Sequence, residues 1–269
     1  MELKLAGKRA LVTGSSSGIG AAIATTLAQE GVTVVIHGRN RERAQSVADK
    51  IATEGGKAIV AIADLSTIEG ATAVVEQSIQ AFGGIDILVN NAGGTDWEFS
   101  NWKSASLEEW EALFQQNFFS ALRLIHAFIP HMQTLGWGRI INIATIWAIQ
   151  PGLGMPHYAA AKAALVNSTV SLAQELAHTG ITVNTVTPGP ILTPPVEQNM
   201  RDLALQYDWS DDWVDIERNY ITQILPLSVN RIGYGSDIAN AVAFLASPLA
   251  DFIDGINLRV DGGYIKSIH

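Results

Sequence analysis

The chain has 269 residues, of which 48% are hydrophobic and 16% charged, a composition that favours a folded globular protein with a large buried core. Its formal net charge of -9 argues against general binding to the polyphosphate backbone of a nucleic acid. It has no cysteine, which excludes disulfides, thiolate nucleophiles and thiolate metal sites and fits a reducing compartment.

No segment of the sequence predicts export or membrane insertion. The first ten residues lack an apolar stretch of signal-peptide length, and no window approaches the roughly 18 uninterrupted apolar residues of a spanning helix. The histidines are scattered, and no ligand spacing predicts a metal site. We expect a cytoplasmic protein that binds no membrane, no nucleic acid and no metal.

In chain order, short β-rich runs alternate with longer helical patterns. Continuous apolar strands separated by helices predict a parallel sheet that is covered on both faces, and right-handed crossovers make that sheet doubly wound. We therefore expect one domain over residues 1–269, an α/β Rossmann-type fold of about seven strands with helices on both faces. The predicted strands cover residues 9–13, 33–37, 58–62, 85–89, 139–144, 182–187 and 256–260.

A glycine-rich turn follows the first strand and precedes a helical pattern. Its glycines are Gly14, Gly18 and Gly20. Glycines allow the backbone to turn tightly and approach a pyrophosphate, and the helix N-terminus supplies oriented N–H groups. Such a turn is a weak indication alone, but between a first strand and a first helix it predicts a dinucleotide site. The alternative is a turn with a purely structural role.

The end of the second strand, His37-Gly38-Arg39-Asn40, bears on the choice of nucleotide. An acidic side chain at this place would hydrogen-bond the ribose 2′-hydroxyl of NAD and repel a 2′-phosphate. Gly38 offers no carboxylate, while Arg39 can make charge-assisted hydrogen bonds to a phosphate. We therefore expect NADP(H), with NAD(H) as the less favoured cofactor.

Two further helices can be placed by their spacing. Ser106 and Glu109 are spaced as in a capping box and precede an apolar helical pattern, which predicts a helix start. Tyr158 and Lys162 are four residues apart, so on a helix they share one face.

A tyrosine and a lysine on one helix face suit the reduction of a carbonyl. The reaction needs an acid that protonates the forming alkoxide, and a tyrosine of ordinary pKa, ~10, is a poor acid–base group at neutral pH. A nearby ammonium together with an oxidised nicotinamide would favour the tyrosinate and lower that pKa. The Tyr-x-x-x-Lys spacing alone is common by chance, but its place after the fifth predicted strand makes Tyr158 the candidate general acid–base, with Lys162 as its support.

Residues 191–231 interrupt the alternation of strands and helices. This stretch holds Tyr207, Trp209, Trp213 and Tyr220 among acidic residues. Long excursions at the ligand edge of a sheet are often functional, so one interpretation is a substrate lid inserted in the domain. The other is an ordinary pair of surface helices with a solvated acidic face.

Several ordered motifs together resemble the short-chain dehydrogenase/reductase family. They are Gly14-x-x-x-Gly18-x-Gly20, Asn90-Asn91-Ala92-Gly93, Tyr158-x-x-x-Lys162, Pro188-Gly189 and Arg259-Val260-Asp261-Gly262-Gly263. The resemblance covers essentially the whole chain. Gly38 occupies the place where NAD-preferring members of the family carry Asp.

The resemblance implies a cofactor groove lined by residues from several strand ends. It would place Asp64 at the adenine edge, Asn91 along the groove, the Ile191 backbone at the nicotinamide carboxamide and Thr193 over the carboxamide or the diphosphate. Asn91 could equally hold the central sheet together, and the two roles are compatible. The full expected set is Gly14, Ser16, Ser17, Gly18, Ile19, Gly20, Arg39, Asp64, Leu65, Asn91, Ala92, Gly93, Tyr158, Lys162, Pro188, Gly189, Ile191 and Thr193.

The resemblance also implies four catalytic residues, namely Tyr158, Lys162, Thr145 and Asn117. The family normally carries Ser thirteen positions before the Tyr, where this chain has Thr145. Threonine keeps the hydroxyl but adds a β-branch and a methyl group. Asn117 would bend its helix so that a water connects Lys162 to solvent; the alternative is a buried helix Asn with local partners.

The expected substrate pocket contains Trp97, Trp147, Gln150 and Met155. Two tryptophans would make its wall aromatic and apolar, which indicates a hydrophobic carbonyl or alcohol substrate. The alternative is that both rings pack in the core or between subunits, since Trp is usually substantially buried.

These observations predict an NADP(H)-dependent oxidoreductase that transfers hydride between nicotinamide and a carbonyl or alcohol. An alternative is a nucleotide-binding sensor or partner protein without efficient turnover, since fold does not dictate function and Thr145 departs from the family pattern. A third is epimerisation or dehydration with a tightly held cofactor. The resemblance further implies a homotetramer.

Overall fold

The computed structural model describes residues 2–95, 100–152 and 154–267, and a parallel sheet lies at its centre. The sheet has seven strands in the order β3-β2-β1-β4-β5-β6-β7, and every neighbouring pair is parallel. The order reverses beside β1, so β1 and β4 diverge at a switch point of the kind that binds ligands in open α/β sheets. The predicted Rossmann-type doubly wound fold is confirmed.

The seven predicted strands are all present within two residues of their expected ends. Most are runs of Val, Ile, Leu and Ala that are buried on both faces, as in an internal parallel sheet. They are β1 (Arg9–Val12), β2 (Thr33–Gly38), β3 (Lys57–Ile62), β4 (Ile87–Asn90), β5 (Gly138–Ile143), β6 (Ile181–Pro188) and β7 (Asn257–Val260).

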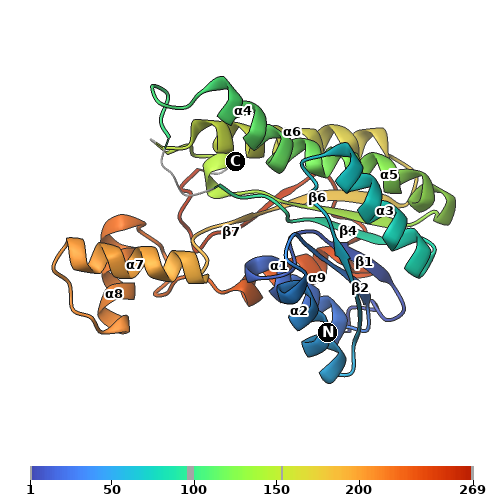
Figure 1. Ribbon diagram of the computed structural model, residues 1–269, viewed down its shortest axis with the longest axis horizontal. Coiled ribbons are helices and arrows are strands. Elements are labelled where there is room, and N and C mark those ends of the chain that lie inside the picture. The colour runs from blue at the N-terminus through green and yellow to red at the C-terminus, as the bar shows by residue number, and fades with distance from the viewer. Residues whose placement is uncertain (1, 96–99, 153, 268–269) are drawn as a thin grey trace.

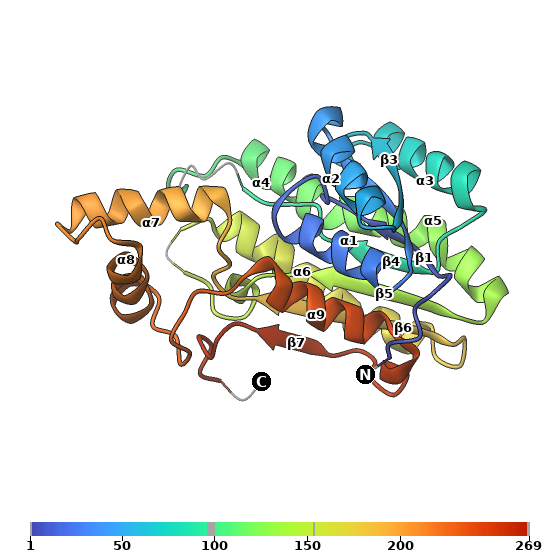
Figure 2. The same ribbon diagram turned by 90° about the horizontal axis from the view of Figure 1, so that it is seen from below.

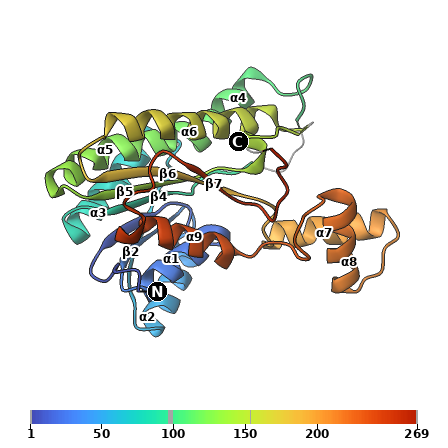
Figure 3. The same cartoon turned by 180° about the vertical axis from the view of Figure 1, so that it is seen from behind.

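Helices cover both faces of the sheet (Figures 1 and 3). Helices α1, α2 and α9 pack on one face, and α3, α5 and α6 pack on the other, with α4 beside α6. Their bounds, with those of α7 and α8, are α1 (Gly18–Gln29), α2 (Arg41–Thr53), α3 (Ile68–Phe82), α4 (Leu107–Phe114), α5 (Ser120–Leu135), α6 (Pro156–Glu175), α7 (Pro194–Gln206), α8 (Trp213–Asn219) and α9 (Gly235–Ala246).

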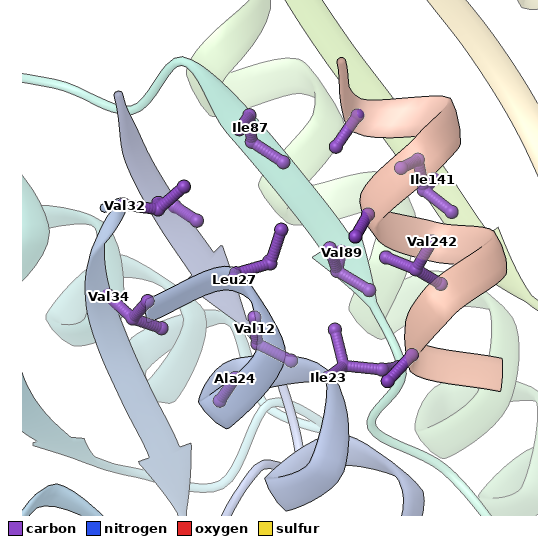
Figure 4. Packing of buried hydrophobic residues seen from close by; sticks show 14 of the residues in the cluster. Val12, Ile23, Ala24, Leu27, Val32, Val34, Ile87, Val89, Ile141 and Val242 are labelled. Atoms are coloured by element: carbon purple, nitrogen blue, oxygen red, sulfur yellow. The ribbon is translucent and has the colours of Figure 1, made fainter. Parts of the chain in front are cut away.

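One hydrophobic core holds the glycine-rich turn in place (Figure 4). Ile23 and Leu27 of α1 are fully buried against Val12 and Val89, at the strand ends that flank the switch point, and Val242 of α9 packs beside them. Burying one such side chain is worth roughly 1.5–3 kcal/mol. The start of α1 is therefore held firmly beside the carboxyl ends of β1 and β4.

A buried polar network fixes α6, which carries Tyr158 and Lys162. Asn142 of β5 accepts a hydrogen bond from Asn90 of β4 at 2.9 Å and donates one to the Thr169 hydroxyl of α6 at 2.9 Å. The Thr169 hydroxyl in turn bonds to Thr185 of β6 at 2.8 Å. A buried chain of hydrogen bonds of this kind restricts the relative positions of its elements. It therefore sets where α6 lies along the sheet.

The 191–231 excursion forms a small helical unit at one end of the molecule (Figures 1 and 2). Its base is pinned, because Leu192 N–H donates to Gly233 at 2.7 Å and Gly233 N–H donates to Pro190 at 3.0 Å. Helices α7 and α8 share a separate apolar cluster centred on Met200 and Ile216. The unit therefore has its own packing and is joined to the sheet through its base.

Candidate active site

The carboxyl ends of the strands border a groove with two halves that meet at the glycine-rich turn. One half, about 540 Å³ in volume, is lined by the ends of β2 and β3, and the other, about 480 Å³, by the ends of β5 and β6 and by α6. Gly14, Ser17 and Gly93 line both halves. A long two-part ligand can therefore cross the sheet edge at the switch point.

At Gly20 the glycine-rich turn packs too closely for a side chain. A Cβ on Gly20 would lie 2.4 Å from the Gly14 carbonyl oxygen and 2.5 Å from Asn91 Nδ2. Ser17 caps α1 with extended backbone but makes no side-chain hydrogen bond to the helix. The first N–H groups of α1 thus face the groove without a side chain over them, an arrangement that favours an anion.

Asn91 ties the glycine-rich turn to the end of β4. Its Nδ2 donates to the carbonyl oxygens of Thr13 at 2.8 Å and Gly14 at 3.2 Å, and its backbone N–H donates to the Thr13 hydroxyl. Asn91 also lines the catalytic half of the groove, while Ala92 lines the other half. The expected structural role of Asn91 is thus present alongside its place at the groove.

His37 is a part of this site that the sequence did not predict. Its Nδ1 accepts a hydrogen bond from Gly14 N–H at 3.1 Å, and its Nε2 lies 3.2 Å from the Ala63 carbonyl oxygen. Burial lowers the pKa of His37 to about 4, so the ring is neutral at pH 7, with the proton on Nε2. Its position in a buried strand gives no indication of this role.

The outer half of the groove is polar and carries the expected nucleotide-selecting residues. Arg39 is exposed there, Asn40 caps α2 by accepting from Arg43 N–H at 2.9 Å, and Leu65 lies alongside. Asp64 accepts a hydrogen bond from Ser66 N–H at 2.9 Å, which lowers the pKa of its carboxyl, and Arg39 adds to that lowering.

Gly38 leaves room for the Ser16 side chain. A Cβ on Gly38 would lie 2.6 Å from Ser16 Oγ and 2.8 Å from Ser16 Cβ. A carboxylate at position 38 would therefore displace Ser16 from its present place. In this chain the Ser16 hydroxyl and the Arg39 guanidinium border the same part of the groove.

Tyr158, Thr145 and Lys162 meet in the inner half of the groove. The Thr145 hydroxyl lies close enough to the Tyr158 phenol to lower the pKa of that phenol in part, and the Lys162 ammonium donates to the Ile143 carbonyl oxygen at 2.8 Å. Thr145 directly follows β5, whereas the other two lie on α6. Parallel strands end at the same edge of the sheet, and so the edge brings these groups together.

Burial moves the pKa values of the tyrosine and the lysine in opposite directions. It raises the pKa of Tyr158 to about 12, although the hydrogen bond from Thr145 lowers it in part. It lowers the pKa of Lys162 to about 8. The expected lowering of the tyrosine pKa is thus not achieved by Lys162 alone in the free protein, because desolvation outweighs the other effects.

Asn117 lies in a π-helical turn, Gln115–Phe119, between α4 and α5. Its Nδ2 donates to Leu113 and Gly94 carbonyl oxygens, both at 3.0 Å, and its Oδ1 accepts from Gly94 N–H at 2.8 Å. A Cβ on Gly93 would lie 2.5 Å from Asn117 Oδ1 and 3.2 Å from Lys162 Nζ. Asn117 is therefore satisfied locally, as the alternative proposed, and also stands beside the ammonium.

The segment after β6 closes the inner half. Pro188, Gly189, Ile191 and Thr193 all line it. The Thr193 methyl would lie 3.7 Å from a Cβ on Gly18, so this segment reaches the glycine-rich turn.

Only some of the expected substrate residues line the inner half of the groove. Trp147 lines the inner half and packs edge-on against Tyr158, with ring centroids 6.5 Å apart. Met155 also lines it and is buried, whereas Gln150 is exposed after the 3₁₀ turn and lies outside that lining. Trp97 lies outside the described residues.

Two searches over the described parts of the chain gave negative results. No group of three or more His, Cys, Asp or Glu residues is arranged to hold a metal ion there. No helix among those residues is long and apolar enough to cross a membrane.

Comparisons with known proteins identify the family. The model of the short chain dehydrogenase family matches residues 8–204. The chain belongs to this family. It is 39% identical to an uncharacterized oxidoreductase, YvaG, of Bacillus subtilis, over the full length of both chains. It is 40% identical to the 3-oxoacyl-[acyl-carrier-protein] reductase of Escherichia coli, over 96% of this chain and 97% of that one.

A solved structure shows the same likeness. The L-sorbose reductase of Gluconobacter frateurii, complexed with NADPH and L-sorbose, is 35% identical, covers 100% of both chains and superposes with a TM-score of 0.91. The present short-chain dehydrogenase is therefore an oxidoreductase by family. It carries Thr145 at the position that the resemblance assigns to Ser, and the hydroxyl still reaches Tyr158.

Proposed function

We propose that the protein is an NADP(H)-dependent oxidoreductase that interconverts a carbonyl and an alcohol, with Tyr158 as general acid–base. The observation that carries this proposal is that Tyr158, Thr145 and Lys162 line one cavity together with the glycine-rich turn. Two hydroxyls beside an ammonium suit a carbonyl oxygen that becomes an alkoxide.

The groove fits a dinucleotide. Its two halves meet at a turn in which Gly14 and Gly20 leave no room for a Cβ, and the start of α1 offers N–H groups where a pyrophosphate would lie. Gly14, Ser17 and Ile191 would hold the nucleotide along its length. When bound, the nicotinamide supplies or accepts the hydride.

Three features support NADP(H) over NAD(H). Gly38 provides no carboxylate to repel a 2′-phosphate, and the Ser16 hydroxyl fills the space beside it. Arg39 is exposed at the same part of the groove and is free to pair with a phosphate. The similar L-sorbose reductase was solved with NADPH.

The protein's own residues supply the proton chemistry. In the reducing direction Tyr158 donates its proton to the substrate oxygen, and Thr145 donates a second hydrogen bond to the same oxygen. The Lys162 ammonium stabilises the tyrosinate that remains. Its hydrogen bond to Ile143 holds it beneath the reacting groups. Asn117 holds Gly94 and the adjoining backbone in position.

Residues 191–231 act as a substrate lid in this proposal. Val196, Tyr220 and Leu225 of this unit line the catalytic cavity, although the unit packs around its own apolar cluster. Together with Trp147 and Met155 they give the substrate side a mainly apolar wall. A hydrophobic carbonyl compound fits such a wall better than a highly hydroxylated one.

The decisive test is the variant Tyr158→Phe with NADPH and a panel of ketones, aldehydes and diketones. Turnover should fall by ~10²–10⁴-fold while the dissociation constant of NADPH, measured by calorimetry, stays within about twofold. Equal turnover by the variant would overturn the mechanism. No turnover by the native protein, with NADPH still bound, would favour the nucleotide-binding sensor.

A further inference from the structure

Tyr220 is a second tyrosine in the wall of the catalytic cavity. It begins the π-helical turn Tyr220–Ile224, which follows α8 in the lid. The cavity that it lines is the one that contains Thr145 and Tyr158. π-Helical turns of this kind occur frequently at functional sites.

The Tyr220 hydroxyl has no hydrogen-bond partner within residues 2–95, 100–152 and 154–267. The residue is only 6% exposed. Over the same residues, the fully buried side-chain atoms without a partner are Asn90 Oδ1, Arg139 Nε and Thr182 Oγ1, and the Tyr220 oxygen is not one of them. The oxygen is therefore not fully enclosed, and the open space that Tyr220 lines is the catalytic cavity.

Apart from the nearby Tyr264, the side chains around Tyr220 are mainly apolar. Its ring packs with Met200 and Ile216 in the lid cluster, and Val196 and Leu225 line the cavity beside it. Burial, with the nearby Tyr264, raises the pKa of Tyr220 to about 12, so the hydroxyl stays a donor at neutral pH. An unpaired donor in an apolar wall is costly unless a ligand pairs with it.

We infer that Tyr220 is a specificity-determining residue that donates a hydrogen bond to a second oxygen of the substrate, apart from the oxygen held by Tyr158 and Thr145. The preferred substrates are then carbonyl compounds that carry another oxygen, as diketones and hydroxyketones do, on an otherwise apolar frame. This inference rests on the proposed function and names its substrate class.

A matched pair of ketones tests it. Propiophenone and 1-phenyl-1,2-propanedione differ only by the second carbonyl oxygen. The dione is intrinsically more reactive, so each variant is compared with the native protein on the same substrate. The variants are Tyr220→Phe, which removes only the hydroxyl, and Tyr207→Phe, a control at an exposed position of the same lid.

In Tyr220→Phe, kcat/KM for the dione should fall about tenfold while that for propiophenone stays within about twofold, as expected for one hydrogen bond. The calorimetric Kd of the dione for the NADP⁺-loaded protein should rise by the same factor. The control should change neither quantity.

Two results would overturn the role of Tyr220. One is an equal loss on both ketones, which would mean that the phenol only shapes the lid, and the other is no loss on either. If the native protein reduces neither ketone, the proposed function is in question, yet the calorimetric comparison still decides the role of Tyr220. If the native protein does not bind the dione, or if the native protein and Tyr220→Phe bind it equally, the role of Tyr220 is overturned.

Discussion

In the proposed function, single residues decide which nucleotide the groove accepts. Arg39 is exposed and lines the groove with Gly38 and Ser16, and we propose that it pairs with the 2′-phosphate of NADP(H). Arg41 and Arg43 follow on α2, where Arg43 lines the groove and Arg41 does not. Charge pairing with a phosphate is therefore concentrated at positions 39 and 43.

The substitution Arg39→Ala should raise the KM for NADPH by about tenfold to a hundredfold, the loss of a charge-assisted hydrogen bond worth roughly 1.5–3 kcal/mol. The KM for NADH should stay within about twofold, because NADH has no 2′-phosphate. Steady-state kinetics with both nucleotides gives the measurement, with Arg41→Ala as the matched control. Equal losses with NADPH and NADH would show that Arg39 does not recognise the phosphate.

The paired titration of Lys162 and Tyr158 predicts opposite pH profiles in the two directions of reaction. Below about pH 8 the lysine is charged and the tyrosine is protonated, the forms that reduction needs. As pH rises through about 8 the ammonium is lost, so kcat for carbonyl reduction should decline. Alcohol oxidation needs the tyrosinate, so kcat for oxidation should rise with pH up to about 8, where the Lys162 ammonium is still charged.

These profiles are measured as kcat at saturating substrate from pH 6 to pH 10 in each direction. A reduction rate that stays level across the whole interval would contradict the assignment of Lys162. The raised pKa of free Tyr158 also has a physical consequence: the tyrosine remains a neutral acid until the cofactor's positive charge arrives beside it.

At the scale of elements, β2 is coupled to the glycine-rich turn through His37. The imidazole joins Gly14 N–H on one side to Ala63 on the other, so it links the turn after β1 to the segment after β3. Gly14 has a φ of +64°, and His37 is the side chain that accepts the N–H of this residue. The ring therefore acts on the cofactor site through backbone position.

Replacing His37 by Leu should raise the Kd of NADPH about tenfold, because Gly14 N–H and Ala63 C=O lose their partner. His37→Asn should restore much of the affinity, since its amide oxygen can lie near the place of Nδ1 and accept from Gly14. Calorimetry measures both variants, and the KM for the ketone should change little. Full affinity in His37→Leu would show that the turn holds its shape without the ring.

The pH dependence of stability against unfolding should also depend on His37. Its folded pKa of about 4 lies below the ordinary 6.5, so as pH falls through this interval the unfolded chain takes up a proton first and stability declines. The measurement is thermal melting of the native protein at pH 7 and pH 5, with His37→Asn as the control. The variant should lose less stability on acidification than the native protein does.

At the scale of the whole molecule, exposed aromatic side chains favour assembly. Phe252 is fully exposed after the 3₁₀ turn that follows α9, and Trp102 is 76% exposed before α4. Trp110, Phe114 and Phe119 line a surface groove over α4 and the π-helical turn after it. Exposed apolar patches of this kind mark interfaces.

We expect the tetramer that the family resemblance implied, with these two surfaces as its interfaces. Light scattering at micromolar concentration should give four times the mass of one chain. The substitution Phe252→Glu should reduce it to a dimer, because a charge in an apolar interface must be desolvated. A monomeric native protein would refute the expectation.

Much of this protein could be predicted from local sequence. Apolar runs separated by helical patterns are properties of the chain itself, so the seven strands, the glycine-rich turn and the Tyr158–Lys162 face follow from periodicity and spacing. Strand ends were less certain: Ile85 was included in a strand that begins at Ile87, because burial alone does not distinguish a paired residue from its neighbours.

The tertiary structure alone decided which distant residues meet. Nothing local to His37 indicates that it accepts a hydrogen bond from Gly14, and nothing local to Tyr220 indicates that this residue lines the catalytic cavity. Helical periodicity at positions 115–119 likewise conceals the π-helical turn that holds Asn117. The sequence by itself determined the family and the order of elements, since these depend on neighbours along the chain. Only packing between elements decided burial, and with it the pKa values of Tyr158 and Lys162.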